Sequence, residues 1–451
     1  MIMLIDELKK IAKESGVVGA GGAGFPSYAK MTDQADTVIL NCVECEPLLK
    51  LHKQLLASHA EEIVRMLDEV RETFGAKEAV IGIKSEHKHT IQILEEVLKD
   101  YDKVRICAVR PTYPMGDEVI LIYEATGRVI KPGGLPIDEH VVVYNVETMY
   151  NLYRAVHLQE PVTDKLVTIV GEIEHPITIS IPLGTTVGEA VSLAGKITVK
   201  NPAFVMGGPM MGKLGTEKTV ITKTTNAIII LPEDHKVVMR MNKNLELERR
   251  KAASSCCQCR TCTEMCPRHA LGHPIEPHRI MRAVANHDTS DLSVYTNTAY
   301  CSSCGLCENY ACPQGLSPRS VIAEFKNGLR AAGIRGEKPE TADVVSDREL
   351  KKVPVARLKA RLGLTEYDVP APLTDDVPDI KRVKILMSQH IGAPARPAVT
   401  EGSPVKKGQK IADAAEGLGV AIHCSIDGIV EKVSEKEIII SVRRTSKDVS
   451  S

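Results

Sequence analysis

The chain has 451 residues, a length that corresponds to about three domains and exceeds a single hydrophobic core. Its 57 basic and 58 acidic side chains give a formal net charge of -1, which does not favour binding to nucleic acid or to an anionic membrane surface. With 43% hydrophobic and 25% charged residues, the composition predicts a folded protein. Because no apolar run is long enough to span a bilayer and the first residues lack a signal-peptide core, we expect a cytoplasmic protein without a membrane span.

The first predicted domain, residues 1–160, alternates between strand and helix patterns. Strands are predicted at residues 37–41 and 79–83, and helices at residues 52–74 and 90–98. This alternation predicts an α/β layer built on a mostly parallel sheet.

The second predicted domain, residues 166–235, contains short β-rich runs and a helix that starts near Thr186, the pattern of a small α+β unit. The third, residues 236–336, should be helical and rich in loops. Its hydrophobic content is low, so we expect metal ligation to provide much of its stability.

The remaining sequence predicts a linker and a last domain. Residues 337–379 carry many charges and several prolines, which predicts a linker with a short helix at residues 347–362. Residues 380–451 contain short strands separated by turn signals, the pattern of a small all-β sandwich.

The cysteines carry the strongest chemical signal. Nine of the 13 lie between residues 256 and 312, which favours metal ligation in a reducing compartment over a disulfide framework. Eight of them form two successive ferredoxin-type runs: Cys256-x2-Cys259-x2-Cys262-x3-Cys266-Pro267 and Cys301-x2-Cys304-x2-Cys307-x4-Cys312-Pro313. The spacing predicts two 4Fe-4S clusters.

The cysteine that precedes each proline is expected to bind the other cluster. We therefore assign Cys256, Cys259, Cys262 and Cys312 to one cluster, and Cys301, Cys304, Cys307 and Cys266 to its neighbour. The spacer before Cys312 is one residue longer than the usual ferredoxin pattern. Structural zinc is the alternative, since zinc also accepts four thiolates from paired Cys-x2-Cys motifs.

A glycine-rich string near the amino terminus is the second signal: Gly19-Ala20-Gly21-Gly22-Ala23-Gly24-Phe25-Pro26. Its small residues leave the backbone amides open to a phosphate or to the edge of an aromatic ring. Spacing alone does not distinguish a cofactor loop from a plain turn, because the string is not a Rossmann GxGxxG that follows a strand.

The complete string resembles the flavin-binding loop of the NADH-binding subunit of respiratory complex I and of the C subunit of Rnf complexes. Further matches follow in the order of that family: Asn41-Cys42-Val43-Glu44-Cys45-Glu46-Pro47, Tyr113-Pro114-Met115-Gly116-Asp117-Glu118, Gly133-Gly134-Leu135-Pro136, Asn145-Val146-Glu147-Thr148 and Gly207-Gly208-Pro209-Met210-Met211-Gly212. Residues 177–195 resemble the family's β-grasp (SLBB) module. With the two cysteine runs, the resemblance covers nearly the whole chain.

The resemblance implies a Rossmann-like FMN/NADH domain, an SLBB module, a helical two-cluster ferredoxin-like module and a C-terminal barrel-sandwich hybrid. It implies that FMN is held by the glycine loop (Gly19, Gly21, Gly22, Ala23 and Gly24) and by Lys30, Asn41, Glu44, Gly116, Asp117 and Asn145. NADH would stack over the flavin, with Phe25 and Glu46 as candidates for its pocket. Asn145 could instead be a turn residue and Lys30 a solvated surface charge, and Cys42 with Cys45 could be read as a redox dithiol.

The last domain resembles the barrel-sandwich hybrid of lipoyl and biotin carriers, but its turn reads Ser425-Ile426-Asp427-Gly428 and lacks the carrier lysine. In the Rnf complex this module precedes the glycine loop, whereas here it follows the cysteines. That order is similar to the cobalamin reductases of propanediol-utilisation bacterial microcompartments.

This resemblance implies an oxidoreductase that passes electrons from NADH through FMN and two 4Fe-4S clusters to cobalamin, for regeneration of adenosylcobalamin. An adenosyltransferase and microcompartment shell proteins would be its partners. The sequence contains no Asp-x-His-x-x-Gly corrinoid motif, so cobalamin would be a visiting electron acceptor. The alternative is an electron-transfer subunit of a membrane-associated redox complex, like the Rnf C subunit.

Overall fold

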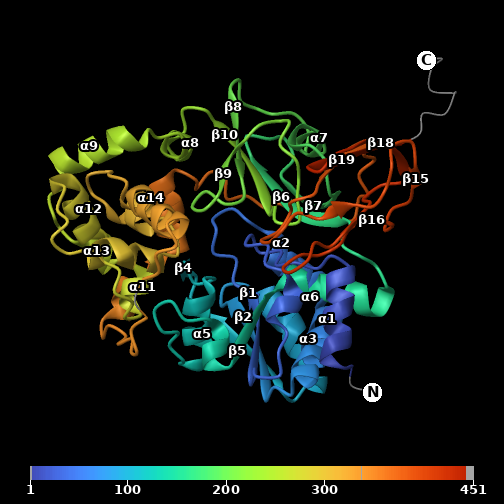
Figure 1. Cartoon of the computed structure of the whole chain (residues 1–451), viewed down its shortest axis with the longest axis horizontal. Helices are drawn as coiled ribbons and strands as arrows, with labels where there is room; N and C mark the ends of the chain where they lie inside the picture. Colours follow the sequence, from blue (N-terminus) through green and yellow to red (C-terminus); the bar gives the residue numbers. More distant parts are fainter. Residues whose placement is uncertain (1–2, 337, 443–451) are drawn as a thin grey trace.

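The computed structural model describes residues 3–336 and 338–442, arranged as four packed modules (Figure 1). The predicted boundary residues 1, 2, 337 and 443–451 lie outside the described part. In Figure 1 the cysteine-bearing helices lie on the left, the C-terminal strands on the right, and the N-terminal α/β module below them. None of the helices formed by the described residues is long and apolar enough to cross a membrane.

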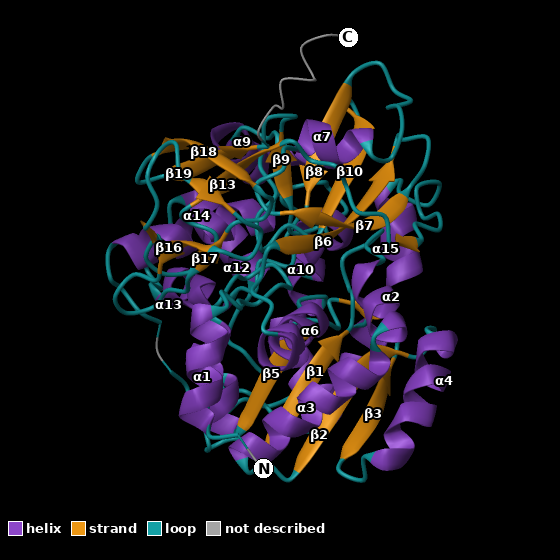
Figure 2. Cartoon of the chain, turned by 90° about the vertical axis from the view of Figure 1, so that its right-hand side faces the viewer, coloured by secondary structure: helices purple, strands orange, loops and turns teal. Residues whose placement is uncertain are grey.

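The N-terminal module is a four-stranded, entirely parallel sheet, as the strand and helix alternation predicts (Figure 2). In spatial order its strands are β3 (Val104–Val109), β2 (Glu78–Lys84), β1 (Thr37–Cys42) and β5 (Val141–Asn145). Its helices are α1 (Ile5–Glu14), α2 (Leu51–Ser58), α3 (Ala60–Phe74), α4 (Lys88–Val97), α5 (Glu118–Thr126) and α6 (Val146–Tyr153).

Alternate residues of β1 face the two sides of this sheet. Val38 and Leu40 pack into the core formed with α1, α3, α4 and α6, while Ile39 packs against α5 on the other face. The predicted helix over residues 52–74 is two helices, because His59 has a non-helical backbone that ends α2 and begins α3.

The second module is a six-stranded sheet with one short helix. In spatial order its strands are β12 (Leu373–Thr374), β7 (Ile177–Pro182), β6 (Asp164–Gly171), β10 (Ala227–Pro232), β8 (Pro202–Met206) and β9 (Lys213–Gly215). Helix α7 (Val187–Ser192) starts directly after Thr186, whose side chain forms a capping box with Glu189.

The third module is helical and has a small core of its own. Its helices are α8 (Lys236–Met241), α9 (Leu245–Ser255), α10 (Thr261–Glu264), α11 (Pro267–Ala270), α12 (Pro277–Asn286), α13 (Ser293–Thr296) and α14 (Pro318–Ala331). Ala252, Ile280 and Val321 from α9, α12 and α14 pack together, with Cys256 and Cys312 at the edge of this core.

The segment predicted to be a linker is packed against the other modules. Its strand β11 (Val353–Pro354) pairs with β4 (Thr112–Tyr113), and β12 completes the sheet of the second module. Between them α15 (Val355–Leu362) buries Leu358 and Leu362 in the core shared with the second module. The predicted helix over residues 347–362 is therefore a 3-10 turn, a short strand and α15. The boundaries of the five predicted segments of the chain stay a prediction.

The C-terminal module is the predicted small β-sandwich. One sheet contains β13 (Arg382–Leu386), β19 (Glu437–Ser441), β18 (Gly428–Val433) and β15 (Pro404–Val405), and the other contains β14 (Arg396–Pro397), β16 (Lys410–Asp413) and β17 (Ile422–His423). The module packs on the N-terminal module through backbone hydrogen bonds from Ala421 to Lys13 and from Ile391 to Gly24.

Candidate cofactor sites

Two predicted flavin residues meet at the point where the strand order of the parallel sheet reverses. Asn41 is the penultimate residue of β1 and Asn145 ends β5, and the two residues are direct partners in the register of these strands. The pair therefore lies at the carboxyl ends of two neighbouring parallel strands, where β5 adds to the sheet on the side of β1 opposite β2. Open α/β sheets bind ligands at this position.

The glycine-rich loop lies over this edge and offers free backbone amides. Hydrogen bonds from Gly19 to Phe25 and from Gly24 to Gly19 close the base of the loop. At its exposed tip, the N–H groups of Gly21, Gly22 and Ala23 form no hydrogen bond within residues 3–336 and 338–442. Such amides fit a phosphate or another oxygen-rich group.

Asn145 and Thr148 hold the loop against helix α6. The Asn145 side chain accepts a hydrogen bond from the Glu147 N–H, and a Cβ at Gly21 would lie 3.2 Å from its Nδ2. The Thr148 hydroxyl accepts from the Ala20 N–H at 2.9 Å. Asn145 is thus both a turn residue and a wall of the candidate site. Thr148 positions the loop. It lies within the Asn145-Val146-Glu147-Thr148 motif, but sequence reasoning did not name it as a site residue.

Asn41 and Gly116 join two loops beneath the site. The Asn41 amide donates to the Gly116 carbonyl at 2.9 Å, and its oxygen accepts from the Val43 N–H at 3.0 Å. A Cβ at Gly116 would lie 2.2 Å from the Val43 carbonyl oxygen, so only glycine permits this approach.

Glu44 points into a buried network. Its carboxylate accepts from the His52 N–H at 2.6 Å, in the first turn of α2. Burial raises the pKa of Glu44 and lowers the pKa of His52 to about 3, so the imidazole is neutral. Beyond His52, Glu147 forms an ion pair with the buried Lys165.

Glu46 connects the N-terminal module to the second module. Its carboxylate accepts from the Met210 N–H at 2.9 Å, and the Tyr113 hydroxyl lies 3.5 Å away. A Cβ at Gly208 would collide with this carboxylate, which explains the glycine in the Gly207-Gly208 motif. Burial raises the pKa of Glu46 to about 7.

Lys30 and Phe25 lie together beside the glycine loop. The Lys30 ammonium is 5.9 Å from the centre of the Phe25 ring and 3.5 Å from the Glu118 carboxylate. Asp117 caps α5 and also receives two hydrogen bonds of 2.8 Å from Arg268 in the cysteine module. The structure thus gives Asp117 a bridging contact that its place in the motif did not predict.

The structure brings the first predicted set of cysteines together. Cys256, Cys259, Cys262 and Cys312 line one pocket, with Cys257 beside them. Burial and the neighbouring thiols raise the pKa of Cys262 to about 12. No group of three or more His, Cys, Asp or Glu side chains in the described residues is placed to hold a single metal ion.

The structure also brings the second predicted set together, although Cys266 precedes the other three cysteines by 35 residues or more. Burial, followed by the nearby Cys304 and Cys301 thiols, raises the pKa of Cys266 to about 12. Burial, followed by the nearby Cys301, Cys304 and Cys266 thiols, raises the pKa of Cys307 well above its usual value. The structure thus places Cys266 beside the second run of cysteines. Four thiols per set fit the donors of a 4Fe-4S cubane, and the crossed ligand assignment stays a prediction.

A π-helical turn accommodates the long spacer before Cys312. Residues Cys307–Ala311 form this turn, which absorbs one residue more than an α-helical turn and ends at Cys312. Amides also point at the sulfurs: the Ser303 N–H donates to Cys301 Sγ at 3.3 Å, and the Leu316 N–H to Cys312 Sγ at 3.4 Å. Such bonds stabilise thiolate ligands.

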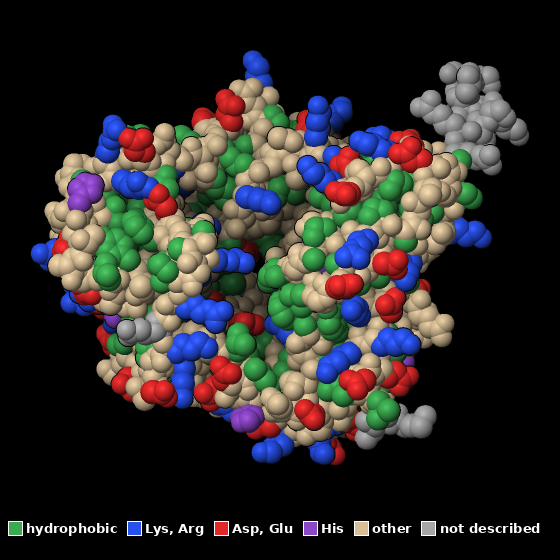
Figure 3. Space-filling view, viewed as in Figure 1, with side chains coloured by type: hydrophobic (Ala, Val, Ile, Leu, Met, Phe, Trp, Pro, Cys, Tyr) green, Lys and Arg blue, Asp and Glu red, His purple; other side chains and the backbone are tan. Residues whose placement is uncertain are grey.

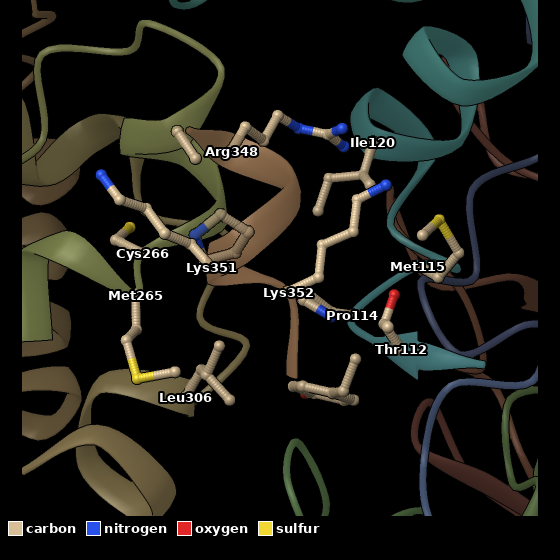
Figure 4. A pocket seen from close by; sticks show the side chains of 13 residues that line it. Thr112, Pro114, Met115, Ile120, Met265, Cys266, Leu306, Arg348, Lys351 and Lys352 are labelled. Carbon is tan, nitrogen blue, oxygen red and sulfur yellow. The ribbon is translucent and has the colours of Figure 1, made fainter. Parts of the chain in front are cut away.

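A pocket lies between the N-terminal module and the second cysteine set (Figure 4). Figure 4 places Thr112 and Met115 on one wall and Met265, Cys266 and Leu306 on the other. The basic side chains of Arg348, Lys351 and Lys352 span it and form ion pairs with Glu124 on α5 and Glu264 on α10. Ion pairs from the predicted linker therefore hold these two modules together.

Four sequence families match consecutive parts of the chain. They are the Nuo51 FMN-binding domain over residues 12–154, the SLBB domain over 166–214, a 4Fe-4S dicluster domain over 255–317 and the RnfC barrel sandwich hybrid domain over 373–446. The chain is 40% identical over 443 residues to the cobalamin reductase PduS of Salmonella typhimurium, covering 98% of this chain and 97% of that protein. The chain belongs to the cobalamin reductase PduS family.

The chain is also similar to two further relatives and to a solved structure. The PduS protein of Citrobacter freundii is 39% identical over 436 residues, with 96% of each chain covered. The C subunit of the Na(+)-translocating ferredoxin:NAD(+) oxidoreductase complex of Acetobacterium woodii is 29% identical over 271 residues, or 58% of each chain. A solved NAD+-reducing [NiFe]-hydrogenase is 19% identical, covers 79% of this chain and 67% of its own, and has a TM-score of 0.48.

The four domain matches and the PduS relatives confirm the family resemblance and the four-part fold class predicted from the sequence. This PduS family member combines an FMN-binding domain with a 4Fe-4S dicluster domain. The assignment of individual ligands stays a prediction. Sequence reasoning did not single out Thr148, Arg268 or Met210, although Thr148 and Met210 lie within the quoted motifs.

Proposed function

We propose that the protein is an NADH-dependent flavo-iron-sulfur reductase that passes electrons through FMN and two 4Fe-4S clusters to cobalamin. The observation that carries this proposal is 40% identity, over nearly the full chain, to a protein named cobalamin reductase. The presence of both an FMN-binding domain and a dicluster domain supports it, because these domains provide a route between a hydride donor and a one-electron acceptor.

We infer that FMN binds at the carboxyl ends of β1 and β5. When bound, FMN would accept a hydride as two electrons and release the electrons singly. The free amides of Gly21, Gly22 and Ala23 suit its phosphate, while the amides of Asn41 and Asn145 hold the floor of the site. The remaining family positions, Lys30, Glu44, Gly116 and Asp117, complete or support this site.

We further infer that NADH approaches beside Phe25 and Glu46. Figure 3 shows a hollow at the centre of this face, between the cysteine module and the other modules, with Lys and Arg side chains around its rim. A basic rim favours the approach of a negatively charged dinucleotide.

The two cysteine sets differ in their burial and in their contacts with the N-terminal module. Cys304 accepts a hydrogen bond from Tyr113, and a Cβ at the adjacent Gly305 would lie 3.3 Å from the Met210 carbonyl oxygen. In the other set, Cys259 is exposed. We infer that the cluster held by Cys266, Cys301, Cys304 and Cys307 receives electrons first and that the other cluster passes them out.

Cobalamin would act as a visiting acceptor. We propose that the reduced corrinoid is used by an adenosyltransferase, and that the protein works in the cytoplasm within a bacterial microcompartment with its shell proteins. The competing function, an electron-transfer subunit of a membrane-associated complex, is favoured by the RnfC-type domain over residues 373–446.

The test is anaerobic reduction of cob(III)alamin by NADH with wild-type protein, a Cys304→Ser variant and a Gly22→Val variant. We expect the wild type to exceed free FMN with NADH, and both variants to lose most of the rate. A wild-type rate no greater than that of free FMN would reject the reductase function. A Cys304→Ser variant that keeps its rate would mean that the flavin reduces cobalamin directly. Weak cobalamin reduction by the wild type, together with binding to a membrane redox partner, would favour the competing function.

A further inference from the structure

A short segment of the SLBB module, residues 222–226, lies against the glycine-rich loop. It directly precedes β10 and faces the loop at two points. A Cβ at Gly24 would lie 2.9 Å from Thr224 Cγ2, and a Cβ at Gly22 would lie 3.8 Å from Asn226 Nδ2. The candidate flavin loop therefore has residues of two modules beside it, Asn145 of the N-terminal module and Asn226 of the SLBB module.

Asn226 is buried with an unsatisfied oxygen. The residue is 7% exposed, and its Oδ1 has no hydrogen-bond partner among the described residues. A buried amide oxygen without a partner is costly, and its presence beside a binding loop calls for an explanation. An asparagine amide both donates and accepts, which matches a ligand that carries hydroxyl and phosphate groups.

The segment that carries Asn226 is held in place by hydrogen bonds to three modules. The buried Lys223 ammonium donates to the Gly16 carbonyl at 2.7 Å and to the Ala421 carbonyl at 3.3 Å, and its backbone N–H donates to Gln389 at 3.2 Å. The Asn226 backbone oxygen accepts from Thr168 at 3.0 Å. Lys223 thus anchors the segment to both the N-terminal and the C-terminal modules.

We propose that Asn226 is a flavin-binding residue supplied by the SLBB module, whose amide hydrogen-bonds the ribityl phosphate chain of FMN. The FMN site is then shared between two modules, with the loop on one side and Asn226 on the other. This inference rests on the proposed function, since it requires FMN at the glycine loop.

The test is FMN affinity, measured by fluorescence quenching as FMN is titrated into protein stripped of flavin. Asn226→Ala should weaken FMN binding about tenfold, because one hydrogen bond is lost. Asn226→Asp keeps the size of the side chain but places a carboxylate beside the phosphate, so it should weaken FMN binding at least as much, and riboflavin binding less. Asn201→Ala, at an exposed asparagine of the same module, should match the wild type.

Iron content and the thermal midpoint of each variant check that it folds. FMN affinities of Asn226→Ala and Asn226→Asp within twofold of the wild type would overturn the inference and leave the proposed function intact. If the Ala variant is unfolded, the Asp variant alone decides. Failure of the wild type to bind FMN would overturn both the inference and the flavin step of the proposed function.

Discussion

The phenol of Tyr113 donates a hydrogen bond of 2.6 Å to the backbone carbonyl of Cys304. Tyr113 belongs to the N-terminal module and Cys304 to the cysteine module, and both residues are buried. The same hydroxyl lies 3.5 Å from Glu46, which accepts from the SLBB module through Met210. One side chain thus touches both the candidate flavin site and a candidate cluster ligand.

Replacing Tyr113 by Phe should loosen the contact between these modules. The variant leaves the buried Cys304 carbonyl without its donor, a loss of about 1–3 kcal/mol in the free energy of unfolding. We expect a lower thermal midpoint with flavin and iron content retained. Tyr295→Phe is the matched control, because the Tyr295 hydroxyl makes an exposed bond within its own module, to Asp288. Equal midpoint shifts in the two variants would contradict the bridging role.

Single cysteine substitutions should remove one cluster at a time. Two cubanes correspond to about eight iron atoms and eight labile sulfides per chain, and Cys304→Ser or Cys259→Ser should each reduce the iron content to about four. Cys257→Ser is the control, since Cys257 is exposed and outside the ligand spacing. Iron and sulfide analysis with electron paramagnetic resonance provides the measurement. Stoichiometric zinc without sulfide, or full iron content in both variants, would refute the cluster assignment.

The parallel sheet and the cysteine sets could be predicted because their signals are local. The strand at β1 and the flanking helices follow from hydrophobic periodicity. The crossed cysteine sets, which stay a prediction, rest on spacing alone. The break at His59 could not be predicted, because the apolar periodicity continues from α2 into α3.

Contacts between modules could not be predicted from the sequence. Tyr113 and Cys304 are 191 positions apart, and nothing near either residue indicates the other. The segment around α15 has the charge and proline content of a linker. Its buried residues, such as Leu358, are few and widely spaced, so the sequence does not indicate that the segment packs against other modules. Asn226 lies in no quoted motif, and its importance depends on how the SLBB module folds against the loop.

Substitution of Gly22 by Val should remove the flavin and spare the clusters. Gly22 has a φ of 118°, which a β-branched residue adopts only at high cost, and the side chain would project toward Asn226. Flavin content should fall well below stoichiometry while iron stays near the wild-type value. Gly328→Val, where a Cβ meets open space in the cysteine module, controls for the substitution itself. Stoichiometric FMN in the Gly22 variant would place the flavin elsewhere.

The buried carboxyl of Glu46 should make the free energy of unfolding depend on pH, and a Glu46→Gln substitution should remove this dependence. Burial raises the pKa of this carboxyl from 4.5 to about 7, so between these values the folded state holds a proton that the unfolded state releases. The stabilising contribution is complete below about pH 4.5 and is lost as the pH rises through about 7. Its full size is about 3 kcal/mol, from the difference between the two pKa values.

A Glu46→Gln variant keeps the acceptor for the Met210 N–H but carries no titratable proton. Its thermal midpoint should therefore gain on the wild type as the pH is raised from 5 to 8, and the difference should level off above pH 8. Thermal unfolding of both proteins across this range measures the effect, with Glu217→Gln, at an exposed carboxylate of the SLBB module, as the control. Parallel curves for the wild type and Glu46→Gln would mean that Glu46 is ionised throughout this range, and that Met210 and Tyr113 together stabilise its charge against burial.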